Sequence, residues 1–135
     1  MTSPSDVVRE FCSAFAAKDL ATIERLLDDK AVYHNVGMEP AVGKDASIAS
    51  IKGFLDMSEV LAFDIHHLAA EGDTVLTERT DTMTVNGITA PIAVMGAFDV
   101  RDGLIVAWRD YFDMGLITKM MSGEAVDPSV LPVFT

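Results

Sequence analysis

Residues 74–99 read TVLTERTDTMTV-NG-ITAPIAVMGAFD. Apolar and polar residues alternate on both sides of Asn86-Gly87, and an Asn-Gly pair between two such segments is the strongest short signal for a β-hairpin. The alternation recurs before and after this hairpin. We therefore expect an antiparallel meander of four strands, at residues 62–70, 74–85, 88–99 and 104–113.

Three helices are predicted ahead of the meander. The first begins at Ser3-Pro4, where a capping side chain is followed by a proline in the first turn. Apolar residues then recur every three or four positions, which is typical of a helix with one buried face. Asp19 and Asp45 are expected to cap the second and third helices, and residues 31–35 are expected to form a short strand between them.

The order of these elements indicates an α+β fold in a single domain covering residues 1–135. The length is close to the ~150 residues typical of one domain. A hydrophobic share of 50% and a charged share of 23% are ordinary for a globular chain. The residues after 114 have no firm period, so we expect a loop there, with room for one short helix.

The charge balance disfavours two kinds of partner. Ten Lys and Arg against 21 Asp and Glu give a net charge of −11, which opposes binding to nucleic acid or to an anionic membrane. The N-terminus lacks the apolar core of a signal peptide, and no apolar run approaches the ~20 residues that cross a bilayer. We therefore expect a cytoplasmic protein.

Charged residues occur on strand faces that are otherwise apolar. Residues i and i+2 share a face of a strand, and this places Arg79 and Asp81 among apolar residues of 74–85 and Asp110 among those of 104–113. Burial of an unpaired carboxylate is costly, so Asp110 needs a partner. Arg79 is the obvious one, because a guanidinium can bridge two carboxylates. In the short early strand, Tyr33 and Asn35 share a face.

Two interpretations of Arg79, Asp81 and Asp110 are open from the face pattern alone. The three side chains can form a structural ion network in a small core. Alternatively, two carboxylates that share one arginine in an apolar setting separate their pKa values, so that one is protonated and the other ionised. That arrangement supplies an acid and a base in one site without a metal.

Three motifs, in this order, resemble the limonene-1,2-epoxide hydrolase family. They are Tyr33-His34-Asn35, Glu78-Arg79-Thr80-Asp81 and Trp108-Arg109-Asp110-Tyr111-Phe112-Asp113. The resemblance covers roughly residues 5–114. It implies the fold of nuclear transport factor 2, in which a strongly curved, cone-like, mostly antiparallel sheet with N-terminal helices packed on it encloses a pocket. It also implies a homodimer packed through the outer face of the sheet.

The resemblance further implies a role for each of five residues. Asp110 would be the general base and Asp81 the acid that protonates the epoxide oxygen. Arg79 would bridge these two carboxylates, while Tyr33 and Asn35 would position the attacking water. No cofactor and no metal are expected. Seven further residues are expected to bind the substrate: Leu55, Met57, Met83, Ile92, Val94, Trp108 and Phe112.

We expect a cofactor-independent hydrolase that converts a small apolar epoxide, such as a cyclic terpene or cycloalkene oxide, to a vicinal diol by attack of an activated water. Two alternatives stay open. One is an isomerase or polyketide cyclase of the same fold that uses a buried Asp as its base, and the other is a non-catalytic module that binds a small ligand or a protein. The α/β-hydrolase mechanism is disfavoured because the sequence has no Gly-x-Ser-x-Gly.

Histidine and cysteine offer weaker candidates. His66 and His67 are neighbours in a predicted strand, where they are expected to point to opposite faces and so not to share a metal ion. Cys12 is the only cysteine, which excludes an internal disulfide, and its place in an amphipathic helix favours packing in the core over a nucleophilic role.

Overall fold

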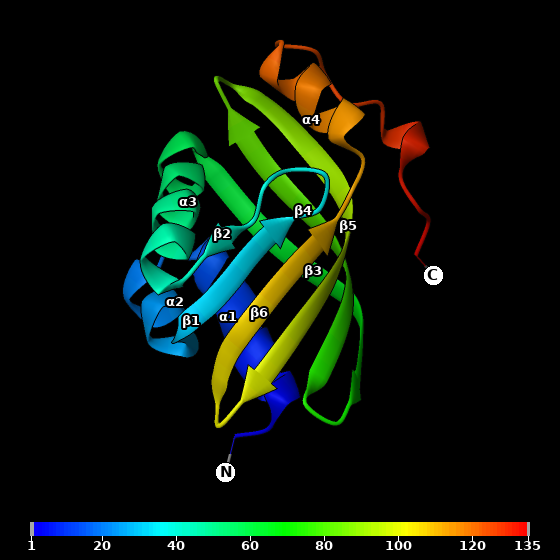
Figure 1. Ribbon diagram of the computed structural model, residues 1–135. Coiled ribbons are helices and arrows are strands. Elements are labelled where there is room, and N and C mark those ends of the chain that lie inside the picture. Colours follow the sequence, from blue (N-terminus) through cyan, green and yellow to red (C-terminus); the bar gives the residue numbers. More distant parts are fainter. Residues whose placement is uncertain (1, 135) are drawn as a thin grey trace.

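The computed structural model describes residues 2–134, and within them the chain is α+β with helices ahead of the long strands, as the sequence predicts (Figure 1). The elements follow in the order α1 (Pro4–Ala16), α2 (Leu20–Leu26), β1 (Leu27–Asn35), β2 (Ala41–Val42), α3 (Lys44–Met57), β3 (Val60–Glu71), β4 (Thr74–Val85), β5 (Ile88–Arg101), β6 (Leu104–Tyr111), α4 (Met114–Met121) and the 3-10 turn η1 (Pro128–Val130).

The strands form one open, curved sheet in the order β2-β1-β6-β5-β4-β3 (Figure 1). The predicted antiparallel meander is confirmed for β3 to β6, and β1 joins β6 in parallel, so the sheet is mixed but mostly antiparallel. The β4–β5 hairpin turns at Asn86 and Gly87, whose φ angles of 52° and 78° are the positive values that a two-residue turn of this kind requires. This turn sets the register of β4 against β5, which also sets which side chains point inward.

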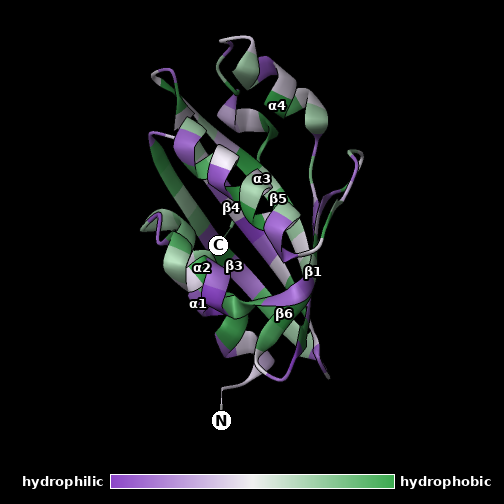
Figure 2. Cartoon of the chain, turned by 60° about the vertical axis from the view of Figure 1, so that its left-hand side comes forward, coloured by the Kyte–Doolittle hydropathy of each residue, from purple (hydrophilic) through white to green (hydrophobic). Residues whose placement is uncertain are grey.

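Helices α1 and α3 cover the inner side of the sheet, α1 against β3 to β6 and α3 against β1 (Figure 1). The α1 helix begins as predicted, because Ser3 and Asp6 form a reciprocal capping box. Phe11 and Phe15 extend from α1 and pack edge-on against Trp108 of β6. Hydrophobic and hydrophilic residues alternate along the helices and along the strands, as expected where each element has one face in the core (Figure 2).

Three predicted starts differ from the structure, and one of them is that of β3, which begins at Val60 and not at residue 62. The third helix starts at Lys44 after Gly43, not after Asp45, because Gly43 has a φ of 92° that favours glycine and turns the chain into the helix. Asp45 lies instead in the first turn, where a carboxylate suits the positive end of the helix dipole. Strand β1 begins at Leu27, four residues earlier than expected, since Leu27 follows α2 directly and pairs with Ile105 of β6.

The end of the chain is more ordered than its sequence suggests. Strand β6 stops at Tyr111, and the side chain of Asp113 caps helix α4 by accepting a hydrogen bond from the amide of Gly115 at 2.8 Å. Met120 and Val126 are buried, so this segment packs on the rest of the molecule. Among the described helices, none combines the length and the hydropathy that a membrane span requires.

Candidate active site

Three charged side chains lie inside the curved sheet. Arg79 and Asp81 extend from the inner face of β4 and Asp110 from that of β6, and their exposed fractions are 1%, 5% and 4%. Alternation in β4 puts every second residue from Val75 to Val85 in the core, so the two charges share a face with apolar residues, as the sequence predicts. Charges that are buried to this extent need partners in well-defined positions.

Arg79 supplies those partners through its planar guanidinium. Its Nε donates to Oδ1 of Asp81 at 3.0 Å and its Nη2 donates to Oδ2 of Asp81 at 2.7 Å. Nη2 also donates to Oδ2 of Asp110 at 2.8 Å, and Nη1 donates to Oδ1 of Asp110 at 3.2 Å. Each carboxylate therefore accepts two hydrogen bonds from one arginine, which fixes both in orientation.

Burial and the neighbouring charges act differently on the pKa values of Arg79 and Asp81. Burial alone would lower the pKa of Arg79, but the two carboxylates raise it well above its usual value, so the side chain stays cationic. Its guanidinium also lies over the ring of Phe63, 4.9 Å from the ring centre. Burial raises the pKa of Asp81 to about 6, although the hydrogen bonds and charge of Arg79 act in the opposite direction. Asp81 therefore keeps its proton up to a higher pH than an ordinary aspartate does.

Asp110 has an additional donor that Asp81 lacks. The indole Nε1 of Trp108 donates to Oδ1 of Asp110 at 2.7 Å, so this carboxylate accepts three hydrogen bonds. Trp108 is itself fixed by its neighbours, since its ring stacks on Tyr33 at a centroid distance of 4.2 Å and on Phe98 at 5.7 Å. These three donors fix the orientation of the carboxylate.

Tyr33 and Asn35 reach the same place from β1. The parallel pairing of β1 with β6 places Asn35 beside Asp110 and Tyr33 beside Trp108. The Tyr33 hydroxyl contacts both ends of the Asn35 amide, accepting from Nδ2 at 3.0 Å and donating to Oδ1 at 3.2 Å. Burial raises the pKa of Tyr33, which keeps the hydroxyl protonated. These two residues thus bring a hydroxyl and an amide next to Asp110.

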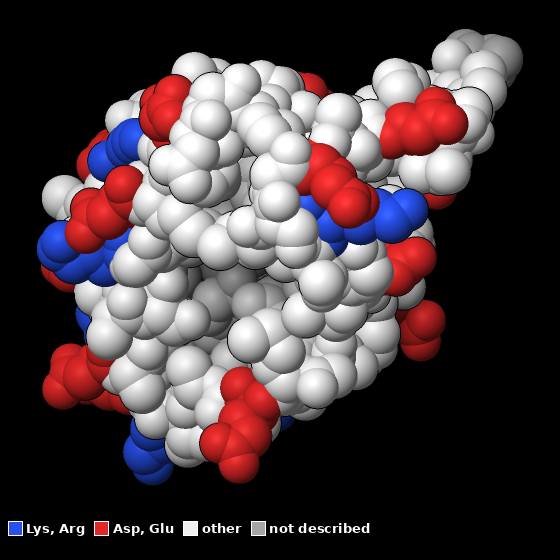
Figure 3. Space-filling view, turned by 90° about the horizontal axis from the view of Figure 1, so that it is seen from above, with Lys and Arg blue, Asp and Glu red and all other residues white. Residues whose placement is uncertain are grey.

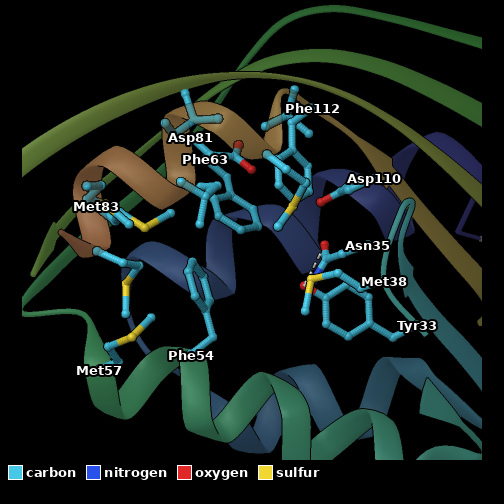
Figure 4. Close-up of a pocket in the computed structure, with 16 residues that line it drawn as sticks. Tyr33, Asn35, Met38, Phe54, Met57, Phe63, Asp81, Met83, Asp110 and Phe112 are labelled. Carbon is cyan, nitrogen blue, oxygen red and sulfur yellow. Dashed lines mark hydrogen bonds between the residues drawn. The ribbon is translucent and has the colours of Figure 1, made fainter. Parts of the chain in front are cut away.

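The polar groups border a cavity of about 220 Å³. In Figure 4 Asp110, Asn35 and Tyr33 lie together on one side of it, and Met57 and Met83 lie on the opposite side. Four lining residues are polar or charged, namely Tyr33, Asn35, Asp81 and Asp110, and the other twelve are apolar. Seen from the end that carries α4, a hollow is surrounded by uncharged residues, while the acidic and basic side chains lie farther out (Figure 3).

Five of the seven predicted substrate-binding residues line this cavity: Met57, Met83, Ile92, Val94 and Phe112. Leu55 and Trp108 do not. In α3 the cavity is lined by Phe54 and Met57, whereas the side chain of Leu55 is buried in the hydrophobic core. Trp108 is separated from the cavity by Tyr33, on which its ring stacks. Sequence reasoning missed seven lining residues: Met38, Phe54, Phe63, Met114, Ile117, Met120 and Met121.

The expected orientation of the histidines is wrong. A β-bulge between Ile65 and His67 breaks the alternation of β3, and both histidines contact outward-facing side chains of β4. His66 bonds to Thr80 at 2.8 Å and His67 to Glu78 at 2.8 Å. Within residues 2–134, no group of three or more His, Cys, Asp or Glu is arranged to hold a metal ion.

The prediction for Cys12 is confirmed, since its side chain is buried in the core. Burial raises the pKa of its thiol to about 12, so the thiolate that a nucleophile needs is scarce at neutral pH.

Comparison with known proteins shows the family of the chain. The profile of the limonene-1,2-epoxide hydrolase catalytic domain matches residues 2–123. The chain is 36% identical over 109 residues to the epoxide hydrolase EphG of Mycobacterium tuberculosis (strain ATCC 25618 / H37Rv), covering 79% of this chain and 71% of that protein.

Solved structures agree with this match. An epoxide hydrolase of M. tuberculosis described as limonene-1,2-epoxide hydrolase-like superposes with a TM-score of 0.73 at 33% identity over 87% of this chain and 88% of the other. A SnoaL-like polyketide cyclase homologue of Shewanella denitrificans OS-217 superposes with a TM-score of 0.80 over 90% and 98%, but at 13% identity it shares the fold alone. The expected nuclear transport factor 2-like fold is confirmed.

Proposed function

Because the chain belongs to the limonene-1,2-epoxide hydrolase family and is an epoxide hydrolase, we propose that it opens a small, largely apolar epoxide to a vicinal diol in one step, without a cofactor and without a covalent enzyme ester. One observation carries the proposal. Arg79 holds two buried carboxylates, Asp81 and Asp110, at the wall of a cavity that is otherwise almost entirely apolar.

Asp110 is the proposed general base. A water held between its carboxylate, the Tyr33 hydroxyl and the Asn35 amide would lose a proton to Asp110 as its oxygen attacks one epoxide carbon. The proximity of Asn35 to Asp110 across the β1–β6 pair supports this position for the water. The hydrogen bonds from Arg79 and Trp108 hold this carboxylate in a fixed orientation for the transfer.

Asp81 is the proposed acid. As the carbon–oxygen bond of the ring breaks, the bonding pair stays on the oxygen, which takes the proton of Asp81. Afterwards Asp110 carries a proton and Asp81 does not, so transfer of one proton through solvent restores the starting state. The raised pKa of Asp81, about 6 because of burial, supports its role as donor. The overall change is epoxide plus water to diol.

The cavity wall supports an apolar substrate class. Its twelve apolar residues include six methionines, whose unbranched side chains adapt to irregular shapes. A cyclic terpene oxide or cycloalkene oxide presents such an apolar surface with one polar oxygen. Placing that oxygen at Asp81 leaves the hydrocarbon against the methionines and phenylalanines.

We also propose that the protein works as a homodimer packed through the outer face of the sheet. Leu76, Met95 and Tyr111 are about half exposed, and they lie near one another on the outward side of β4, β5 and β6. Exposed apolar side chains grouped on a sheet face are typical of an interface.

A panel of epoxides tests the proposed reaction. We expect conversion of cyclic apolar epoxides to diols by the purified protein, and single-turnover hydrolysis in heavy-oxygen water should place the label in the diol. Absence of turnover on every member would contradict the proposal. Label that appears first in the protein would indicate a covalent ester instead, and isomerised carbonyl products without diol would favour an isomerase of the same fold.

A further inference from the structure

The Arg79 guanidinium that links Asp81 to Asp110 passes over a strand that carries neither of the two acids. Arg79 belongs to β4 and Asp110 to β6, and β5 lies between these strands. In the register of the sheet, Gly96 of β5 is opposite Thr77 on one side and opposite Asp110 on the other. The guanidinium must therefore cross β5 at the level of Gly96 to reach Asp110.

The hydrogen bonds of Nη1 follow this row. Nη1 of Arg79 donates to Oγ1 of Thr77 and to Oδ1 of Asp110, each at 3.2 Å, so it bonds to the two residues on either side of Gly96. With the bonds of Nε and Nη2, all five N–H donors of the guanidinium have an acceptor. No donor is free to compensate if the guanidinium shifts.

A side chain at position 96 would occupy the same space. A Cβ atom built on Gly96 would lie 2.8 Å from Oδ1 of Asp110, 2.9 Å from Oγ1 of Thr77, and closer still to Nη1 of Arg79. Such separations are far below ordinary contact. The backbone gives no other reason for glycine at this position, because the φ angle of Gly96 is not positive. A glycine inside a strand also weakens that strand.

We propose that Gly96 is a positioning residue of the active site, whose missing side chain leaves the gap through which Arg79 bridges Asp81 and Asp110. Only the kinetic consequence rests on the proposed function, since the gap itself is a property of the packed fold. A methyl group at this position would push the guanidinium off Asp110 while leaving the cavity wall intact. The paired acid and base would then lose their common orientation.

Kinetics of Gly96→Ala provide the first test, with Gly53→Ala as the matched control. Gly53 lies in α3, is exposed, and a Cβ there meets nothing within 4 Å. On the best substrate of the epoxide panel, we expect kcat to fall by about 100-fold in Gly96→Ala with little change in KM, because a displacement near 1 Å has that effect on a catalytic group. Gly53→Ala should keep the kcat and KM of the wild type. Unchanged kcat in Gly96→Ala would overturn the proposal.

Two further measurements do not depend on turnover. In nuclear magnetic resonance spectra, the Nε–Hε signal of Arg79 should shift in Gly96→Ala and stay in place in Gly53→Ala. Thermal unfolding should show that Gly96→Ala lowers Tm in the wild type by at least about twice as much as it does in an Arg79→Lys background. In that background Nη1 is absent, so the Thr77 and Asp110 oxygens that it holds can move away from the added methyl group.

The outcomes separate this proposal from the proposed function. An equal loss of Tm in both backgrounds, or an unmoved Arg79 signal, would show that Gly96 serves strand packing alone and would overturn the inference. Failure of the wild type to hydrolyse any epoxide, together with the expected Tm and resonance changes, would reject the proposed function and keep the role of Gly96 in positioning Arg79.

Discussion

At the scale of single residues, Asp81 and Asp110 differ in their neighbours more than in their distance from Arg79. Each accepts two hydrogen bonds from the guanidinium, at 2.7 to 3.2 Å. Only Asp110 accepts another from Trp108, and only Asp110 has Asn35 opposite it in the adjacent strand. Two aspartates in such different environments can have two roles, and this supports the proposal that Asp110 accepts a proton while Asp81 donates one.

Replacement of Asp110 by asparagine tests the base directly. The amide would keep the size of the side chain and one oxygen acceptor, but it cannot take a proton from water. We expect Asp110→Asn to lower kcat by about 100-fold to 10,000-fold, the usual contribution of a general base. Circular dichroism should show an unchanged fold, and Asp102→Asn in the exposed β5–β6 turn serves as control. Wild-type activity in Asp110→Asn would remove Asp110 from the mechanism.

The pH profile tests the acid. Burial raises the pKa of Asp81 to about 6, so the carboxyl is protonated below this pH and loses its proton above it. Since only the protonated form can donate to the epoxide oxygen, kcat/KM should fall as the pH rises through about 6, by tenfold per unit at the limit. A stopped assay from pH 4.5 to 9 measures this falling limb of the pH profile. Measurements at intervals of roughly half a pH unit are enough to locate its midpoint.

The matched variant for that profile is Asp81→Asn. It should have a much lower kcat/KM and no limb near pH 6, because no proton is lost from position 81. A limb that persists unchanged in Asp81→Asn would assign the titration to another group.

At the scale of elements, the four strands of the meander could be predicted, whereas the short strand β2 and the bounds of the last helix could not. Alternation and Asn86-Gly87 locate the meander, because one face of each strand is buried and the turn requires positive φ angles. Helix α4 reads Met-Gly-Leu-Ile-Thr-Lys-Met-Met and is only eight residues long, so no polar face marks its period. Its one local signal is Asp113 as cap, two residues before Gly115.

The same contrast applies to the site. Arg79, Asp81 and Asp110 could be found because a charge on an apolar strand face is visible in the sequence. The apolar wall could not be ranked, since any hydrophobic residue of a small domain is a candidate for its core. Seven lining residues were missed for this reason, and the four from Met114 to Met121 depend on how the chain folds back after β6.

Helix α4 should therefore contribute to substrate affinity. Ile117 lines the cavity and is half buried, and Lys119 of the same helix is exposed and does not line it. We expect Ile117→Ala to raise KM for apolar epoxides by about tenfold with little change in kcat, because it removes apolar contact equally from substrate and transition state. Steady-state kinetics on two epoxides of different size measure the effect. Lys119→Ala is the control, and equal KM values in both variants would contradict a role for α4 in binding.

At the scale of the whole molecule, the net charge of −11 bears on assembly. Asp81 and Asp110 are compensated in part by Arg79 inside, so most of the excess of acids lies on the surface and two copies repel each other. The proposed interface counters this with apolar contact from Leu76 and Met95. Salt screens repulsion beyond about 10 Å at 0.1 M, so association should strengthen as salt is added.

Sedimentation equilibrium of the wild type and of Met95→Glu tests this assembly. We expect a dimer mass for the wild type, with a lower Kd in higher salt, and a monomer mass for Met95→Glu, because a charge would be buried in the interface. Val42→Glu is the control, since Val42 is exposed on the edge strand β2. Met95 does not line the cavity, so Met95→Glu should keep the kcat of the wild type. A wild type that stays monomeric at every concentration and salt would leave the outer face of the sheet without the proposed partner, whereas a monomeric and inactive Met95→Glu would mean that the second copy supports the site.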